Sequence, residues 1–228
     1  MSVQEVSVAT SDDTFARRSG TVCLWGAVLG AASGVFLAVV PAQVDSDVYS
    51  YPLENMPFAA IQVFFFIQHL ALLIGVIGLS RSGATGSSWL AKFGVGAAVA
   101  GMGLLALLEL AAITVANAAY PGPRTDLFDA FYGVASLVIG AGLVLAGVAV
   151  LRTRLWHGWP RWIPLAAGIY VFVPMIPAIM GPFVLARLSI AGWMLLFAML
   201  GWALMRSSAP GSASITSLDN SAPARSAS

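Results

Sequence analysis

The chain has 228 residues, of which 59% are hydrophobic and 9% are charged, and its formal net charge is +1. A soluble domain carries about 25% charged residues, so this composition excludes an ordinary water-soluble domain and indicates a protein surrounded by lipid. The near-zero net charge argues against nucleic acid as a partner, because nucleic-acid binding depends on a surplus of basic residues. The single cysteine excludes an internal disulfide.

Six hydrophobic runs reach the length of about 20 residues that a transmembrane helix needs. We predict helices over residues 21–41, 57–80, 90–117, 126–151, 161–180 and 182–205. The predicted fold class is therefore all-α, a polytopic integral membrane protein that forms a six-transmembrane-helix bundle over residues 20–206. The flanking segments, 1–19 and 207–228, have few hydrophobic residues to bury, so we predict that both are disordered tails.

Two features of these runs leave alternatives open. The first run is followed by Val40-Pro41-Ala42, which loosely resembles a signal-peptide cleavage site, but its apolar stretch is longer than a signal core. The fifth run contains Pro174 and Pro177, each of which removes a backbone donor. We therefore expect a kink in the outer half of the fifth helix, which either opens a cavity or fits a curved bundle.

The basic residues predict the orientation, because loops rich in arginine and lysine stay in the cytoplasm. Nearly all of them lie in four segments on one side of the bundle. Arg17 and Arg18 precede the first helix, and Arg81 and Lys92 lie between the second and third helices. The other two segments are the loop between the fourth and fifth helices, with Arg152, Arg154 and Arg161, and the end of the sixth helix, with Arg206. The opposite loops hold only Arg124, and the first of these loops is acidic. We expect cytoplasmic N- and C-termini and a multi-pass protein of the plasma (cytoplasmic) membrane. Ten arginines against one lysine indicate a GC-rich, bacterial genome.

Small residues predict how the helices pack. Gly26, Gly30 and Gly34 repeat at four-residue spacing on the first helix, so they share one face and allow another helix to approach closely. The face either packs within the chain or docks a second copy or another membrane protein. The lipid bilayer is the one partner that composition requires.

Two charged residues lie at membrane depth, where each costs roughly 2.5–3.5 kcal/mol. From the predicted helix ends, Glu109 lies about 12 Å and Arg187 about 8 Å below the outer surface. Asn117 shares the face of Glu109 on the third helix. We predict a Glu109–Arg187 pair. It is either a structural clasp or part of a site in which Arg187 holds an anionic ligand, unless Arg187 extends to the interface instead.

Further polar residues fall on the second and fourth helices. Gln62 and His69 are seven residues apart and share one face. His69 is either a neutral, hydrogen-bonded histidine or a proton carrier, since histidine titrates near neutral pH. Asp126, Asp129 and Tyr132 form a stripe at the start of the fourth helix, where the helix dipole favours carboxylates.

These residues converge by depth and predict a polar cavity in the outer half of the bundle. Candidate catalytic residues are Glu109, Asp129 and His69. Candidate ligand-binding residues are Gln62, Asn117, Asp126, Tyr132 and Arg187. The sequence favours a small permease or a membrane-embedded enzyme that handles a small or amphipathic molecule, and it leaves open which of the two. The alternative is a structural or accessory subunit whose polar residues only clamp helices. We expect no cofactor and no metal, because the spans hold a single histidine and the lone cysteine makes no dithiol.

Overall fold

The computed structural model describes the backbone of residues 3–206 and the side chains of residues 12–206, and this part of the chain is built from helices and loops. The α-helices are α1 (Val3–Val39), α2 (Asn55–Arg81), α3 (Trp89–Ala112), α4 (Pro123–Thr153), α5 (Ile163–Tyr170), α6 (Ile176–Ile179) and α7 (Phe183–Arg206). Two 3₁₀ segments, η1 (Ile113–Val115) and η2 (Trp159–Trp162), and one π-helical segment, η3 (Val171–Met175), complete the set. These segments make up six spans that are long and apolar enough to cross a membrane, as predicted. The fifth span, Trp159–Ile179, comprises η2, α5, η3 and α6.

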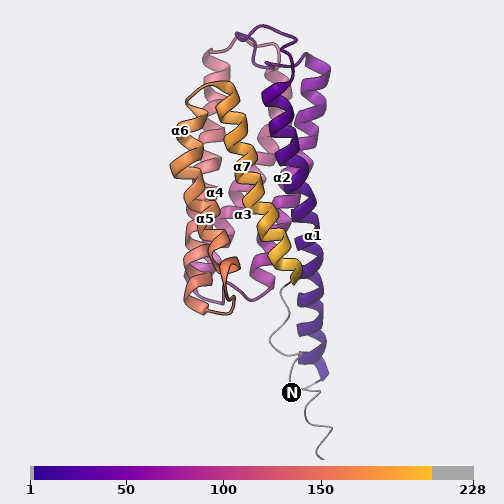
Figure 1. The fold of residues 1–228 in the computed structure, drawn as a ribbon, viewed down its shortest axis with the longest axis vertical. Coiled ribbons are helices and arrows are strands. Elements are labelled where there is room, and N and C mark those ends of the chain that lie inside the picture. The colour runs from indigo at the N-terminus through magenta and orange to yellow at the C-terminus, as the bar shows by residue number, and fades with distance from the viewer. Residues whose placement is uncertain (1–2, 207–228) are drawn as a thin grey trace, which may run out of the picture.

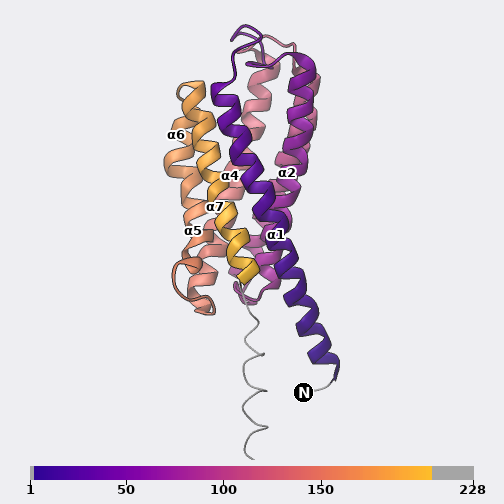
Figure 2. The same ribbon diagram turned by 45° about the vertical axis from the view of Figure 1, so that its right-hand side comes forward.

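The six spans run side by side along the long axis of the molecule and form a bundle (Figure 1). Each span packs against the next in chain order, and α1 packs against α7, which closes the ring. Figure 2 shows the same parallel arrangement from a second direction. We call the end that carries loops 40–54 and 116–122 the cap end. The opposite end, where α1 begins, α7 ends and the arginine-rich loops lie, is the basic end.

Glycine brings neighbouring helices of this ring into backbone contact. A Cβ atom added to Gly201 of α7 would lie 2.5 Å from the backbone nitrogen of Leu24 and 2.6 Å from the carbonyl oxygen of Gly20, both on α1. Neither atom can move without displacing a helix. The pairs that meet in this way are Gly20 with Gly201, Gly94 with Gly142, and Gly140 with Gly168. Close approach of this kind stabilises helix pairs in lipid through dispersion contacts.

The glycines of the predicted α1 face also lie against helices of the same chain. A Cβ atom on Gly26 would meet Ala71 of α2, and one on Gly30 would meet the side chain of Gln68. Gly34 faces Ala191 of α7 in the same way. Packing within the chain therefore accounts for this face, and association through it with a second copy or another protein stays a prediction.

The start of α1 differs from the predicted disordered tail over residues 1–19. The helix begins at Val3 and continues without a break into the first span. Its first turns extend past the rest of the bundle at the basic end (Figure 2). Side chains hold the later turns in place: Ala16 and Ser19 are buried, and Arg81 of α2 pairs with Asp12 at 3.1 Å. The predicted tail over 207–228 lies outside the described residues.

The fifth span is irregular where the two prolines lie. The α-helical ladder of α5 changes to π-type hydrogen bonding over η3, which contains Pro174, and then returns to α-type in α6, which contains Pro177. Proline has no N–H, so the ladder must rearrange around it. The disturbance lies toward the cap end of the span, which agrees with the half that the sequence predicts to be distorted.

The loops of the cap end are joined to each other by backbone hydrogen bonds. The amide of Tyr49 donates to the carbonyl of Ala118 at 3.0 Å, and the amide of Tyr120 donates to the carbonyl of Asp47 at 2.7 Å. Between them, Val48 and Ala119 form an isolated antiparallel bridge. The peptide bonds Tyr51–Pro52 and Tyr120–Pro121, one in each loop, are cis. The two loops therefore form one cap that ties the α1–α2 connection to the α3–α4 connection.

We expect the double variant Val48→Cys/Ala119→Cys to form a disulfide across this cap. The two residues are a non-hydrogen-bonded antiparallel pair, whose Cα atoms are about 4.5 Å apart, within the range that a disulfide spans. Mild oxidation of the purified protein should consume both thiols in alkylation assays followed by mass spectrometry. Each single variant is the control and should keep its thiol. Free thiols at positions 48 and 119 in the oxidised double variant, apart from that of the native Cys23, would show that the loops do not pair.

Candidate functional site

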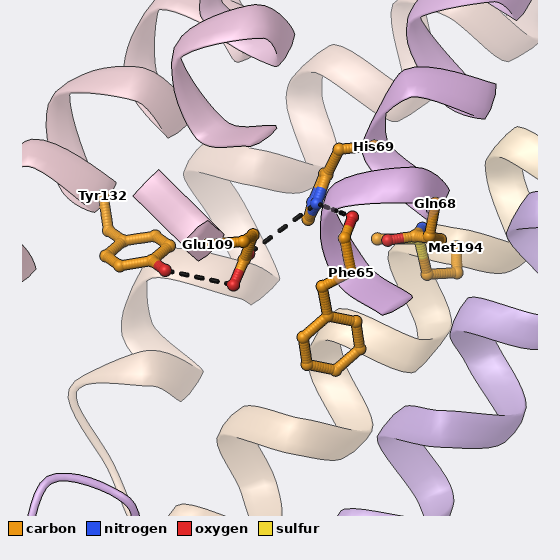
Figure 3. A network of polar contacts seen from close by, with 6 residues as sticks. All are labelled: Phe65, Gln68, His69, Glu109, Tyr132 and Met194. Carbon is orange, nitrogen blue, oxygen red and sulfur yellow. Dashed lines mark hydrogen bonds and ion pairs between the residues drawn. The ribbon is translucent and has the colours of Figure 1, made fainter. Parts of the chain in front are cut away.

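Glu109 lies at the centre of a buried polar cluster. It belongs to α3, about two turns before the span ends at Val115, and it is only 6% exposed. The Tyr132 hydroxyl of α4 donates a hydrogen bond to its Oε2 atom at 3.0 Å. Figure 3 shows Tyr132 and His69 approaching this carboxyl group from opposite sides. Three helices therefore meet at one ionisable group at membrane depth.

His69 of α2 is the second ionisable member of this cluster. Its Nδ1 atom lies 2.8 Å from the carbonyl oxygen of Phe65, and because a carbonyl only accepts, Nδ1 carries the proton. The same atom lies 3.7 Å from Oε1 of Glu109, which is too long for a hydrogen bond but close enough for charges to interact. In the neutral ring the proton-accepting nitrogen is then Nε2. The backbone of α2 thus fixes which nitrogen of His69 is free to take up a proton.

Gln62 completes the cluster on the cap side of His69. It is 6% exposed, and its side chain lies near the Tyr132 hydroxyl. We call Gln62, His69, Glu109 and Tyr132 the Glu109 cluster. All four are among the residues that the sequence singles out, and α2, α3 and α4 bring them together because they occupy the inward faces of these helices.

Arg187 does not form the predicted direct pair with Glu109. Across the described residues, no carboxylate lies within salt-bridge distance of its guanidinium group, which lies 4.9 Å from the centre of the Phe183 ring instead. Glu109 instead accepts a hydrogen bond from Tyr132 and lies beside His69. Arg187 nevertheless lies close enough for its charge to act on Glu109 and Tyr132. It faces the same region as the cluster without being neutralised there.

The structure does not bring the remaining candidates into this cluster. Asp126 and Asp129 are exposed on α4, and Asn117 is exposed in the turn that follows η1 rather than on α3. Asp129 instead lies in hydrogen-bonding reach of Tyr120 in the cap. Asp129 therefore lies at the exposed rim beneath the cap, about one turn nearer the start of α4 than Tyr132, and its action together with Glu109 stays a prediction.

Tyr49 is a residue of this region that the sequence does not reveal. The cap holds it over the bundle, where its ring contacts Phe58, Tyr120 and Phe128 at centroid distances of 6.0–6.2 Å. Burial raises the pKa of the Tyr49 hydroxyl above its ordinary value, and the charges of Asp129 and Glu109 add to this effect. The phenol therefore stays protonated. A tyrosine in a polar loop gives no sign of burial, since only the pairing of two distant loops places it there.

A second buried amide lies on the other side of α2 and is separate from the cluster. Gln68 points away from His69, and its amide nitrogen lies 2.8 Å from the sulfur of Met194 on α7 (Figure 3). Its side chain occupies the space that Gly30 of α1 leaves open. This contact joins three helices by packing and brings no ionisable group with it. Within residues 12–206, no three histidine, cysteine or acidic side chains gather closely enough to hold a metal ion.

The geometry defines the class of protein. The residues that the structure describes are all-helical, and their six long apolar helices are compatible with a multi-pass membrane protein, with a buried cluster of ionisable and hydroxyl groups between the helices. No protein-family model, curated protein or solved structure matches the chain. The cluster itself is therefore the starting point for a function.

Proposed function

We propose that the chain is a small permease or membrane-embedded enzyme that handles a small, amphipathic and anionic molecule at the Glu109 cluster. The observation that carries this proposal is the position of Glu109, buried at membrane depth between a hydroxyl donor at 3.0 Å and an imidazole at 3.7 Å. Ionisable groups inside a membrane are costly and usually serve ion, proton or substrate pathways.

The two ionisable groups support a proton-linked role. With Nδ1 of His69 held by the carbonyl of Phe65, Nε2 is the nitrogen that accepts a proton, and Glu109, which faces Nδ1, is the second group of the cluster that can hold one. Proton transfer between such groups is a common way to couple transport or acid–base chemistry. In this proposal, His69 takes up a proton at Nε2 and Glu109 takes one up at its carboxyl group, while Tyr132 holds that carboxyl group in place.

Arg187 supports the anionic character of the molecule. Its guanidinium group has no carboxylate partner among the described residues, yet its charge acts on Glu109 and Tyr132. A guanidinium group binds carboxylates and phosphates through paired hydrogen bonds. In this proposal, Arg187 holds the anionic head of the molecule, and the apolar part lies among the surrounding aromatic rings, of which Phe183 is one.

The second candidate function is that of an accessory subunit. The hydrogen bond from Tyr132 to Glu109 joins α3 to α4, and the His69 contact joins α3 to α2. These contacts suit a structural clasp as well. A clasp, however, leaves Arg187 without a role, so we favour the ligand site.

We further propose that the basic end faces the cytoplasm of a bacterial plasma membrane. The loops of the basic end and the last turn of α7 carry the arginines, whereas the α1–α2 loop carries Asp45, Asp47 and Glu54. The cap then lies outside the cytoplasm, where disulfides form. The Val48→Cys/Ala119→Cys pair should therefore oxidise in intact cells without added oxidant. Thiols that stay reduced there, but oxidise after purification, would place the cap in the cytoplasm.

Ligand binding at the cluster gives the decisive test of function. Purified protein is screened by thermal unfolding against a panel of amphipathic carboxylates, phosphates and amines. We expect an anionic member to stabilise the wild type. Arg187→Gln should bind it roughly 10–100-fold more weakly, since it loses a charge-assisted hydrogen bond, whereas Glu109→Gln tests the proton-linked role. The same compound should change the internal pH of vesicles that contain the protein and a trapped pH-sensitive dye, or be converted to a product.

Glu54→Gln is the matched control for this test. Glu54 is an exposed carboxylate at the start of α2, and its side chain makes no capping hydrogen bond, so the variant should bind the compound as the wild type does. Equal binding by all four proteins would refute the ligand site. Binding without any change in vesicle pH and without conversion would refute the proton-linked role.

A further inference from the structure

The basic end carries an aromatic and basic surface that the Glu109 cluster does not involve. Trp159 of η2 stacks on Trp202 of α7, with ring centres 5.3 Å apart and planes 26° apart. The guanidinium group of Arg206 lies 3.6 Å from the centre of the Trp202 ring. Trp159 is 45% exposed and Arg206 is exposed as well, so this stack faces the surroundings of the bundle.

Arg161 belongs to the same 3₁₀ segment as Trp159. It is two residues from Trp159, and its guanidinium group lies 5.3 Å from the centre of the Trp162 ring. Its Nε atom is buried and has no hydrogen-bond partner among the residues that the structure describes. A buried donor without an acceptor costs about 1–3 kcal/mol. An oxygen-rich anion that reached this arginine would satisfy its remaining donors.

The sequence around this surface contains no acidic residue. Residues 152–162, together with the last turn of α7, hold four arginines and no aspartate or glutamate. At the same end, Arg81 is different, because it pairs with Asp12 at 3.1 Å. This part of the basic end therefore carries a surplus of positive charge.

We propose that Trp159, Arg161, Trp202 and Arg206, the tryptophan–arginine patch, bind the head group of an anionic phospholipid. Guanidinium groups pair with phosphate oxygens through parallel hydrogen bonds, and tryptophan rings lie at the level of lipid head groups. Basic sites between helices at this depth are suited to anionic head groups. A free anion would use the arginines alone, whereas a lipid also covers the exposed tryptophan rings. This inference is independent of the function proposed for the Glu109 cluster.

Lipid-dependent stability tests this proposal. The full chain is purified in a neutral detergent, and thermal unfolding is followed as phosphatidylglycerol, phosphatidylcholine or inorganic phosphate is added. We expect phosphatidylglycerol to raise the melting temperature and the other two to leave it nearly unchanged. In Arg161→Gln and in Arg206→Gln, half-maximal stabilisation should need about five times more phosphatidylglycerol, the effect of removing one basic contact.

Arg81→Gln is the matched control, because it removes one positive charge from the same end of the bundle but outside the patch. It should respond to phosphatidylglycerol as the wild type does. Native mass spectrometry of all four proteins provides a readout that does not depend on their intrinsic stability, and bound phosphatidylglycerol should decrease only in the two patch variants. An equal loss of bound phosphatidylglycerol in Arg81→Gln would mean that the lipid responds to the total positive charge of the basic end and not to the patch. Equal stabilisation by inorganic phosphate would assign the patch to free anions, and equal stabilisation by phosphatidylcholine would remove the role of charge.

Discussion

Gly201→Ala is expected to destabilise the bundle by about 1–3 kcal/mol, the usual cost of overpacking a tight contact. The added Cβ atom would lie 2.5 Å from the backbone nitrogen of Leu24 and 2.6 Å from the carbonyl of Gly20. Both are backbone atoms, so α1 must shift away from α7 to make room. The measurement is the free energy of unfolding in mixed micelles as a denaturing detergent is added.

Gly96→Ala is the matched control for this substitution. Gly96 lies on an exposed face of α3, and a Cβ atom there would meet nothing within 4 Å. Alanine at such a position stabilises a helix by up to about 1 kcal/mol, because it reduces the freedom of the unfolded chain. The two variants should therefore change stability in opposite directions. A loss of similar size in both would mean that the α1–α7 contact is not the cause of the destabilisation.

The sequence predicts the six spans well, because the length of an apolar run is set by the thickness of the bilayer. Its predictions are weaker for the contacts between spans. Gly26, Gly30 and Gly34 stand out by their spacing, yet α1 approaches the backbone of α7 more closely at Gly20 and Gly201 than at Gly34. Helices in lipid carry apolar side chains on all sides, so periodicity does not show which face is inside.

The members of the Glu109 cluster were predictable from the sequence, but their contacts were not. Depth and spacing select Gln62, His69, Glu109 and Tyr132, because a polar residue at membrane depth must face the interior. Depth alone does not decide which of them touch. Depth therefore suggests an ion pair between Glu109 and Arg187. The rotation of each helix about its axis places Tyr132 and His69 next to Glu109 instead.

The cap was not predictable from the sequence. Its loops are polar, and nothing in their composition shows that residues 48 and 119 form a bridge. Pairing between loops that are some 70 residues apart depends on the helices that bring their ends together. The burial of Tyr49 follows from that pairing, which is why it is missed.

Replacing Glu109 by methionine should destabilise the protein by about 1–3 kcal/mol, because the Tyr132 hydroxyl then stays buried without its acceptor. Tyr132→Phe alone removes the donor instead. The double variant, Glu109→Met/Tyr132→Phe, removes both partners and should be more stable than the sum of the single effects predicts, by about 0.6–2 kcal/mol. Unfolding in mixed micelles measures all four corners of this cycle. Strictly additive effects would contradict the hydrogen bond between α3 and α4.

Glu109→Gln then separates a clasp from a proton-exchanging site. The amide oxygen of glutamine still accepts the Tyr132 hydrogen bond, so the stability of this variant should stay within about 1 kcal/mol of the wild type. Glutamine has no ionisable proton, however, so any coupling of ligand to vesicle pH should be lost completely. A clasp needs only the acceptor and would survive the exchange in every respect. The combination of a stable fold with lost coupling is therefore specific to a site that works through the ionisable carboxyl group of Glu109.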